Sequence, residues 1–96
     1  MGQHKVKFKS YNCVLEKLTY RNDRIALELF DEKNGEPVLV ATVNIPNEFI
    51  ETDEIIIKNY SENEGILETL IRASIISQPV RFAQNNQGMP ICKLLI

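Results

Sequence analysis

Hydrophobic and polar residues alternate along much of this 96-residue chain, a period typical of strands with one buried face. In "KVKFK", residues 5–9, the two apolar side chains fall on one face and the three lysines on the other. The alternation slips within residues 12–20, where a β-bulge near Glu16 or Lys17 would restore it. Two strands are therefore predicted before the short polar turn at residues 21–23.

Residues 24–45 contain two β-like runs on either side of Asn34 and Gly35. This dipeptide suits a two-residue type I′ turn, in which both central residues take a positive φ. Such a turn would pair Leu29 with Val40 and leave both strand faces largely apolar. The pattern therefore predicts a hairpin near the centre of a sheet, ending at Pro46, which cannot donate to a strand ladder.

The second half of the chain predicts one helix between short strands. Residues 54–58 are an apolar run typical of a buried strand. A helix is predicted over residues 62–75, where apolar side chains recur at helical spacing (Ile66, Leu67, Leu70, Ile71). Two last strands follow, at 79–83 and 91–96, joined by a loop at 84–90.

This order of elements predicts an α+β fold. We expect an antiparallel sheet of five or six strands with one amphipathic helix packed on one face, in a single small globular domain over residues 1–96. One helix can cover only one face of such a sheet. The other face must curl on itself or meet a partner.

The composition also allows a prediction of where the protein resides in the cell. The chain is 44% hydrophobic and 25% charged, with a formal net charge of −2, as in ordinary globular proteins. Neither a spanning apolar run nor a signal peptide is visible, so a cytoplasmic location is expected. Cys13 and Cys92 are far apart in the sequence and are expected to be reduced, with Cys92 buried in the last strand.

The polar segment "KNYSENEG", residues 58–65, allows two interpretations. Ser61 and Glu64 have the S-x-x-E spacing of a capping box, which would begin the helix. Tyr60 and Asn63 are not needed by that cap, and Gly65 in a first helical turn is unfavourable unless something packs against it. The segment is therefore either only a cap or an interaction patch made of Tyr60, Asn63, Glu64 and Gly65.

Three blocks of the sequence carry a resemblance to a known family. "ATVNIP" at 41–46, "IIIKNYSENEG" at 55–65 and "MPICKLL" at 89–95 resemble the consensus blocks of a family of small uncharacterised bacterial proteins. That family is a domain of unknown function, often encoded on plasmids, phages and conjugative elements. Its members often have Trp before the SENEG block, where this chain has Tyr60. The resemblance implies an accessory protein of mobile DNA that acts on a host protein, and it implies no reaction or ligand.

Catalytic chemistry has few candidates in this sequence. The one histidine, His4, lies near the N-terminus and is expected to be solvated. No Ser/His/Asp or Cys/His catalytic set can be built without it. There is no phosphate-binding glycine motif and no CxxC pair. Neither an enzyme nor a cofactor, metal or small-molecule substrate is predicted.

The leading prediction is a non-catalytic protein-interaction or regulatory module. The alternative is a weak nucleic-acid-binding domain that uses a lysine strip, defined as Lys5, Lys7, Lys9 and Lys17. The net negative charge provides no overall attraction to a polyanion, and lysines on an edge strand commonly serve to block aggregation. Protein binding is therefore favoured over nucleic-acid binding.

Overall fold

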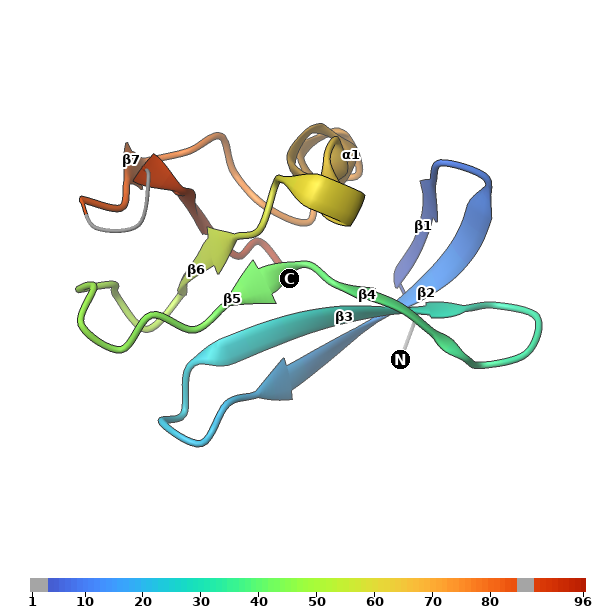
Figure 1. Ribbon diagram of the computed structural model, residues 1–96, viewed down its shortest axis with the longest axis horizontal. Coiled ribbons are helices and arrows are strands. Elements are labelled where there is room, and N and C mark those ends of the chain that lie inside the picture. Colours follow the sequence, from blue (N-terminus) through green and yellow to red (C-terminus); the bar gives the residue numbers. More distant parts are fainter. Residues whose placement is uncertain (1–3, 85–87) are drawn as a thin grey trace.

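A computed structural model describes residues 4–84 and 88–96, and in these ranges the chain forms two antiparallel sheets and one α-helix (Figure 1). The N-terminal sheet has the order β1 (His4–Phe8), β2 (Tyr11–Thr19), β3 (Ile25–Asp31), β4 (Pro37–Val40). The C-terminal sheet has the order β5 (Thr42–Val43), β6 (Glu54–Ile57), β8 (Pro90–Lys93), β7 (Arg81–Phe82). A short 3-10 helix, η1 (Ser61–Asn63), precedes α1 (Ile66–Arg72).

The α+β class is confirmed, but the prediction of one sheet with five or six strands is wrong, because each sheet has four. The chain changes sheets at Ala41, which is completely buried. Its N–H donates to Leu27 in the N-terminal sheet at 2.8 Å, while its C=O accepts from the N–H of Lys58 after β6, also at 2.8 Å. One predicted strand is thus divided into β4 and β5, each pairing in a different sheet.

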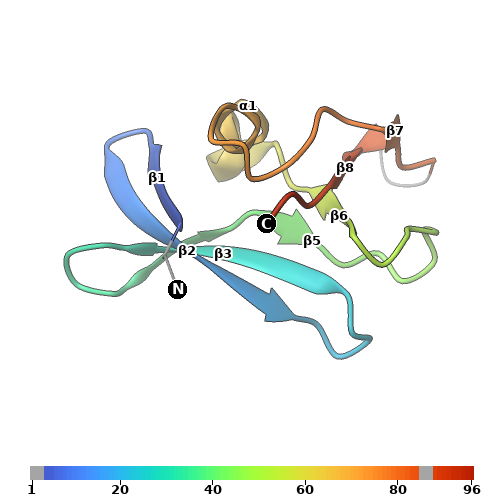
Figure 2. The same ribbon diagram turned by 180° about the vertical axis from the view of Figure 1, so that it is seen from behind.

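The main hydrophobic core lies where the two sheets and the helix meet. In Figures 1 and 2, α1 lies between β1 and the C-terminal sheet. Apolar side chains from all three parts are fully buried there, among them Leu27, Leu29, Ile55, Ile57, Ile66 and Leu70. Among the described residues, no helix is both long enough and apolar enough to cross a membrane.

The helix is shorter than the 62–75 predicted. Gly65, directly before α1, has a φ of 99°, in the left-handed region, so η1 and α1 cannot form one continuous helix. At the other end Ser74 has a φ of 62°, which turns the chain out of the helix after Arg72. The N–H of Ile75 then bonds the C=O of Leu70 at 3.0 Å and closes the last turn.

The predicted hairpin around Gly35 exists, but its register differs by one residue. Leu29 pairs with Leu39 rather than Val40, and a bulge lies between Leu29 and Phe30. Asn34 keeps a negative φ, so the type I′ turn does not form and a longer loop connects the strands. The bulge predicted near Glu16 or Lys17 is also absent, because β2 pairs regularly with β3 along its length.

Both cysteines are free thiols with buried side chains, and the predicted burial of Cys92 is confirmed. Burial raises the pKa of Cys92 to about 11. The pKa of Cys13 is also raised, mainly by burial and secondarily by the charge of Asp31. Residues 85–87 of the predicted loop at 84–90 lie outside the described ranges.

Candidate functional site

The polar segment 58–65 does not contain the predicted capping box. Ser61 lies inside η1 with a φ of 55°, and α1 begins five residues later, at Ile66. Asn59 performs the capping instead, since its Oδ1 accepts hydrogen bonds from the N–H groups of Gly65 at 3.1 Å and Leu67 at 3.0 Å. Two amides that a helix start leaves unpaired are thereby satisfied.

Asn63 is completely buried, so its predicted place on a surface patch is wrong. Its Nδ2 donates to the C=O of Val40, at the end of β4, at 2.7 Å. Its Oδ1 has no partner among the described residues. Burial of an amide side chain is costly unless it is bonded, so the bond to Val40 explains why Asn63 points inward.

Gly65 also has a structural explanation rather than a binding one. A Cβ added there would lie 3.8 Å from the Phe8 ring, an ordinary contact, so close packing does not require glycine. The positive φ does require it, because side chains with a Cβ rarely adopt that conformation. Glu64, the residue before, is exposed.

Tyr60 is the member of the predicted patch that presents a large side chain to solvent, with 45% of its surface exposed. Lys58 Nζ lies 5.7 Å from the centre of its ring and 2.9 Å from Oε2 of Glu62. The hydrogen bond between these two charged groups raises the pKa of Lys58 and lowers the pKa of Glu62. Tyr60 therefore stands beside a fixed ion pair.

The lysine strip does not exist as one surface. Val6 pairs with Cys13, so residues in phase with Cys13, including Lys17, lie on the opposite face from Lys5 and Lys7. Lys5 is bound to Glu32 at 2.7 Å. Lys17 was included because it is near the other lysines in the sequence, but the regular pairing of β2 keeps it in phase with Cys13 and therefore on the other face.

Lys9, a member of the predicted lysine strip, contacts the polar segment 58–65 through Glu62, which lies outside the predicted patch. It lies in the tight turn between β1 and β2 with a φ of 55°, and its Nζ donates to the C=O of Glu62 at 3.0 Å. The same Nζ lies 5.2 Å from the centre of the Phe8 ring. The turn after β1 is therefore fastened to η1.

A cleft of about 510 Å³ opens between this turn, the β3–β4 hairpin and η1, and we call it the hairpin cleft. Figure 1 shows the two hairpins diverging on this side of the molecule. The cleft is lined by Phe8, Lys9, Tyr11, Asp31, Asn34, Glu36, Pro37, Val38, Leu39 and Glu62. The lining combines apolar residues and Tyr11, which is 46% exposed, with three acidic residues and one lysine.

Sequence reasoning missed most of this cleft. The sequence predicts only a turn and the start of a strand for residues 34–38, and it assigns no role to Tyr11. The signal in the sequence was an aromatic residue, Tyr11, directly after a short polar turn. Which hairpin its side chain faces depends on tertiary structure.

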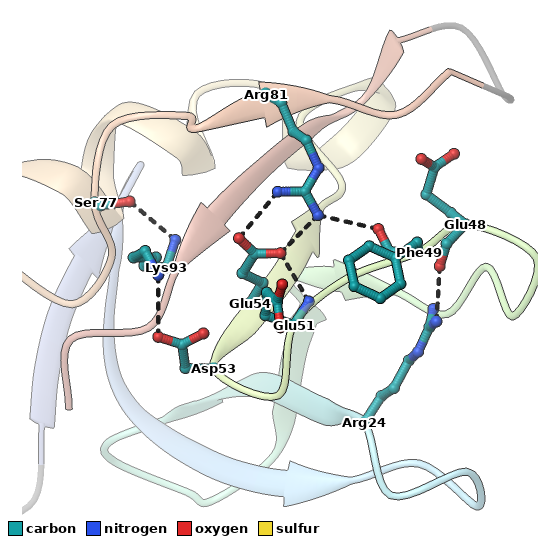
Figure 3. Close-up of polar contacts among 9 residues, drawn as sticks. All are labelled: Arg24, Glu48, Phe49, Glu51, Asp53, Glu54, Ser77, Arg81 and Lys93. Carbon is teal, nitrogen blue, oxygen red and sulfur yellow. Dashed lines mark hydrogen bonds and ion pairs between the residues drawn. The ribbon is translucent and has the colours of Figure 1, made fainter.

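A second polar cluster, drawn in Figure 3, is an anchor within the C-terminal sheet. Arg81 donates to both carboxylate oxygens of the buried Glu54, at 2.7 and 3.0 Å, and to the C=O of Phe49 at 3.0 Å. The N–H of Glu51 donates to the same carboxylate at 2.8 Å. The hydrogen bonds from Arg81 lower the pKa of Glu54. Both carboxylate oxygens are occupied, so this pair holds the loop before β6 against β7.

Within residues 4–84 and 88–96, no group of three or more His, Cys, Asp or Glu side chains is placed to hold a metal ion. His4 is exposed at the start of β1. No family model, no curated protein and no solved structure matches this chain. Arguments about function therefore rest on the surfaces described above.

Proposed function

We propose that this protein is a non-catalytic protein-interaction module, and that the hairpin cleft holds a polypeptide segment of its partner. The observation that carries the proposal is the exposed ring of Tyr11 in a cleft whose wall includes Val38 and Leu39. Tyrosine is among the side chains that contribute most to protein interfaces, since it combines a large apolar ring with a hydroxyl group.

The mixed lining of the cleft favours a polypeptide over other ligands. Asp31 and Glu36 place carboxylates beside the apolar wall, and Glu62 adds a third from η1. Polypeptide segments can supply both apolar side chains and hydrogen-bond donors to such a surface. Tyr60 and Glu64 are exposed near Glu62 in the sequence and extend the proposed contact beyond the cleft.

Nucleic-acid binding remains the alternative, supported by Lys7, for which the described residues offer no ion pair. Three observations favour protein binding over it. Lys5 is paired with Glu32, Lys17 faces the other side of the sheet, and carboxylates outnumber the one lysine in the cleft. A phosphate group bound in the cleft would be repelled by these nearby carboxylates.

The family resemblance of the SENEG block supports a host protein in the bacterial cytoplasm as the partner. This remains a prediction about biological context, as does the origin of the gene in mobile DNA. Neither the cleft nor its lining depends on it.

Site-specific photocrosslinking tests the proposal. A photoreactive phenylalanine analogue replaces Tyr11, and a matched variant carries it at Phe49, an exposed aromatic position of the loop before β6. In a host-cell extract we expect the Tyr11 variant to crosslink a discrete protein that the Phe49 variant does not. Equal crosslinking at both positions, or crosslinking to nucleic acid that is abolished by salt, would contradict it.

A further inference from the structure

Strand β1 is an edge of the N-terminal sheet and presents unpaired backbone groups on its free side. Asn12 lies opposite Lys7, and its C=O accepts from the N–H of Glu32 at 2.9 Å, on the β3 side. In an antiparallel pair, the backbone groups of two opposite residues either face each other or both point away. The N–H and C=O of Lys7 therefore point away from β2, and those of Lys5, two residues earlier, do the same. In the described part of the chain, no hydrogen bond satisfies these four groups.

A hollow of about 250 Å³ lies along this free edge, between β1 and α1, and we call it the edge groove. Lys5, Val6 and Lys7 all line it, although Val6 points into the core and the two lysines point to the opposite face. A hollow that touches three consecutive strand residues follows the backbone edge, because their side chains alternate between the two faces. Its other wall is α1, which lies beside β1 in Figures 1 and 2. The residues of α1 and its C-terminal end that line the groove are Thr69, Arg72 and Ala73.

The lining of the edge groove is basic, since it contains two lysines and an arginine but no acidic residue. Lys7 makes no ion pair with the described residues. Lys5 contacts Glu32 at 2.7 Å, but its side chain is 62% exposed. Arg72 lies 3.6 Å from Glu68 and its side chain is 81% exposed, so this surface pair is weak. The groove therefore has a positive charge that an acidic ligand would complement.

We propose that the edge groove binds an extended acidic segment of another protein, which adds a strand to the N-terminal sheet beside β1. Unpaired N–H and C=O groups alternate along this edge, and another strand pairs both kinds at once. Partner residues opposite Lys5 and Lys7 are two positions apart, and their side chains lie on the same face as the lysines. Acidic residues at these two positions meet the lysines. The residue between them points toward Val6 and α1, where Thr69 and Ala73 suit a small apolar side chain.

A nucleic acid and a second copy of the chain both fit this edge less well. Phosphate groups offer acceptor oxygens alone, so they cannot pair with the C=O groups of Lys5 and Lys7. Antiparallel pairing of β1 with the β1 of a second copy sets lysines against lysines in every register that joins the outward groups. The other edge strands, β4, β5 and β7, contain no acidic residue.

Amide hydrogen exchange measured by nuclear magnetic resonance tests the proposal, with a short synthetic peptide of alternating Glu and Val as the probe. In the free protein, the amides of Lys5 and Lys7 should exchange rapidly, because they have no acceptor. With the peptide in excess, their exchange should slow by about ten-fold or more. The amide of Val6 already pairs with β2 and is the internal reference.

Two methylated peptides separate strand pairing from attraction by charge. Methylation of the Glu amides removes the N–H groups that face β1, so binding should fall about ten-fold or more. Methylation of the Val amides, which face away from β1, should leave binding close to that of the unmodified peptide. Equal binding of the two methylated peptides would show that charge alone attracts them and would overturn the proposal.

Protein variants provide the matched controls. Lys5→Gln/Lys7→Gln should melt close to the original protein, because both lysines are exposed, and should bind the peptide about ten-fold or more weakly. Lys17→Gln removes an exposed lysine from the opposite face of the sheet and should leave binding unchanged. Tyr11→Ala should also leave it unchanged, because no residue lines both the edge groove and the hairpin cleft.

Three results would overturn the proposal. One is failure of the unmodified peptide to protect the amides of Lys5 and Lys7. Another is protection of these amides in the free protein together with sedimentation as a dimer, since a second copy would then cover the edge. The third is tighter binding of single-stranded DNA than of the peptide, since the lysines would then serve a polyanion.

Discussion

The Asn63 side chain donates a hydrogen bond of 2.7 Å to the C=O of Val40 and ties the segment before α1 to the edge strand of the N-terminal sheet. An edge strand leaves such carbonyl groups unpaired and open to pairing with other chains. Pro37, which has no N–H, opens the same strand. Asn63 therefore joins two elements that are distant in the sequence and also shields part of an exposed edge.

Replacement of Asn63 by alanine should lower the free energy of unfolding by about 1–3 kcal/mol, since it removes the hydrogen bond to the C=O of Val40 and opens a small cavity where the buried side chain was. Ser61→Ala is the matched control, because the Ser61 side chain is exposed and caps no helix. It should change stability by less than about 0.5 kcal/mol. Urea unfolding of both variants measures the difference, and equal losses would show that Asn63 has no special role.

Replacement of Asn59 by alanine should cost about 0.5–2 kcal/mol, because the amides of Gly65 and Leu67 lose their acceptor. Asn59→Asp keeps an acceptor oxygen at the start of α1 and should retain most of the stability. Thermal melting followed by circular dichroism distinguishes the two variants. If both variants melt alike, the two hydrogen bonds of Asn59 do not stabilise the helix start.

The fold was predictable from the sequence where the signal is local. Alternation identified β1 and the N-terminal part of β2, and helical spacing identified α1. The change of sheet at Ala41 was not predictable from the sequence. A small residue between two apolar runs is compatible both with one straight strand and with a bend between two strands. The register of the β3–β4 hairpin failed for a similar reason, since the bulge between Leu29 and Phe30 depends on packing.

The candidate site was predictable only in part. The S-x-x-E spacing of Ser61 and Glu64 matched a capping box, but Gly65 takes a left-handed conformation that places the helix start later. Asn63 looked like a surface residue because its neighbours in the sequence are polar. Its burial depends on a carbonyl 23 positions away, and no local pattern records that.

The pair of Glu54 and Arg81 should make stability depend on acid pH. Because the pKa of Glu54 is lowered in the folded protein, its contribution is present above the ordinary carboxyl pKa of 4.5 and is lost as the pH falls through the lower, folded value. Glu54→Gln should cost about 2 kcal/mol at neutral pH, since charged hydrogen bonds are removed. It should also lose less further stability between about pH 7 and about pH 3 than the original protein.

Urea unfolding at a series of pH values measures this effect. Glu68→Gln is the control, since Glu68 is exposed and its contact with Arg72 is 3.6 Å long. The control should follow the pH dependence of the original protein. If Glu54→Gln follows it as well, the acid sensitivity arises from other carboxylates.

Both cysteines should resist labelling until the protein unfolds. The Cys92 side chain is completely buried and its pKa is raised to about 11, so at pH 8 almost none of it is the reactive thiolate. Cys13 is buried as well and its pKa is also raised. Absorbance after addition of a thiol-reactive disulfide should show no rapid phase in the native protein and two thiols in urea. A rapid native phase would mean that the core opens locally around β2 or β8.

Tyr60→Ala separates binding from stability in the segment 58–65. The ring is 45% exposed and its contact with Lys58 is at the surface, so the loss should change the free energy of unfolding by no more than about 1 kcal/mol. The Lys58–Glu62 ion pair does not involve the ring and should persist. If Tyr60 extends the partner contact beyond the hairpin cleft, the crosslinking yield from the Tyr11 position should fall in this variant while melting stays the same. An unchanged crosslinking yield would show that residues 58–65 have only a structural role, carried by the hydrogen bonds of Asn59 and Asn63.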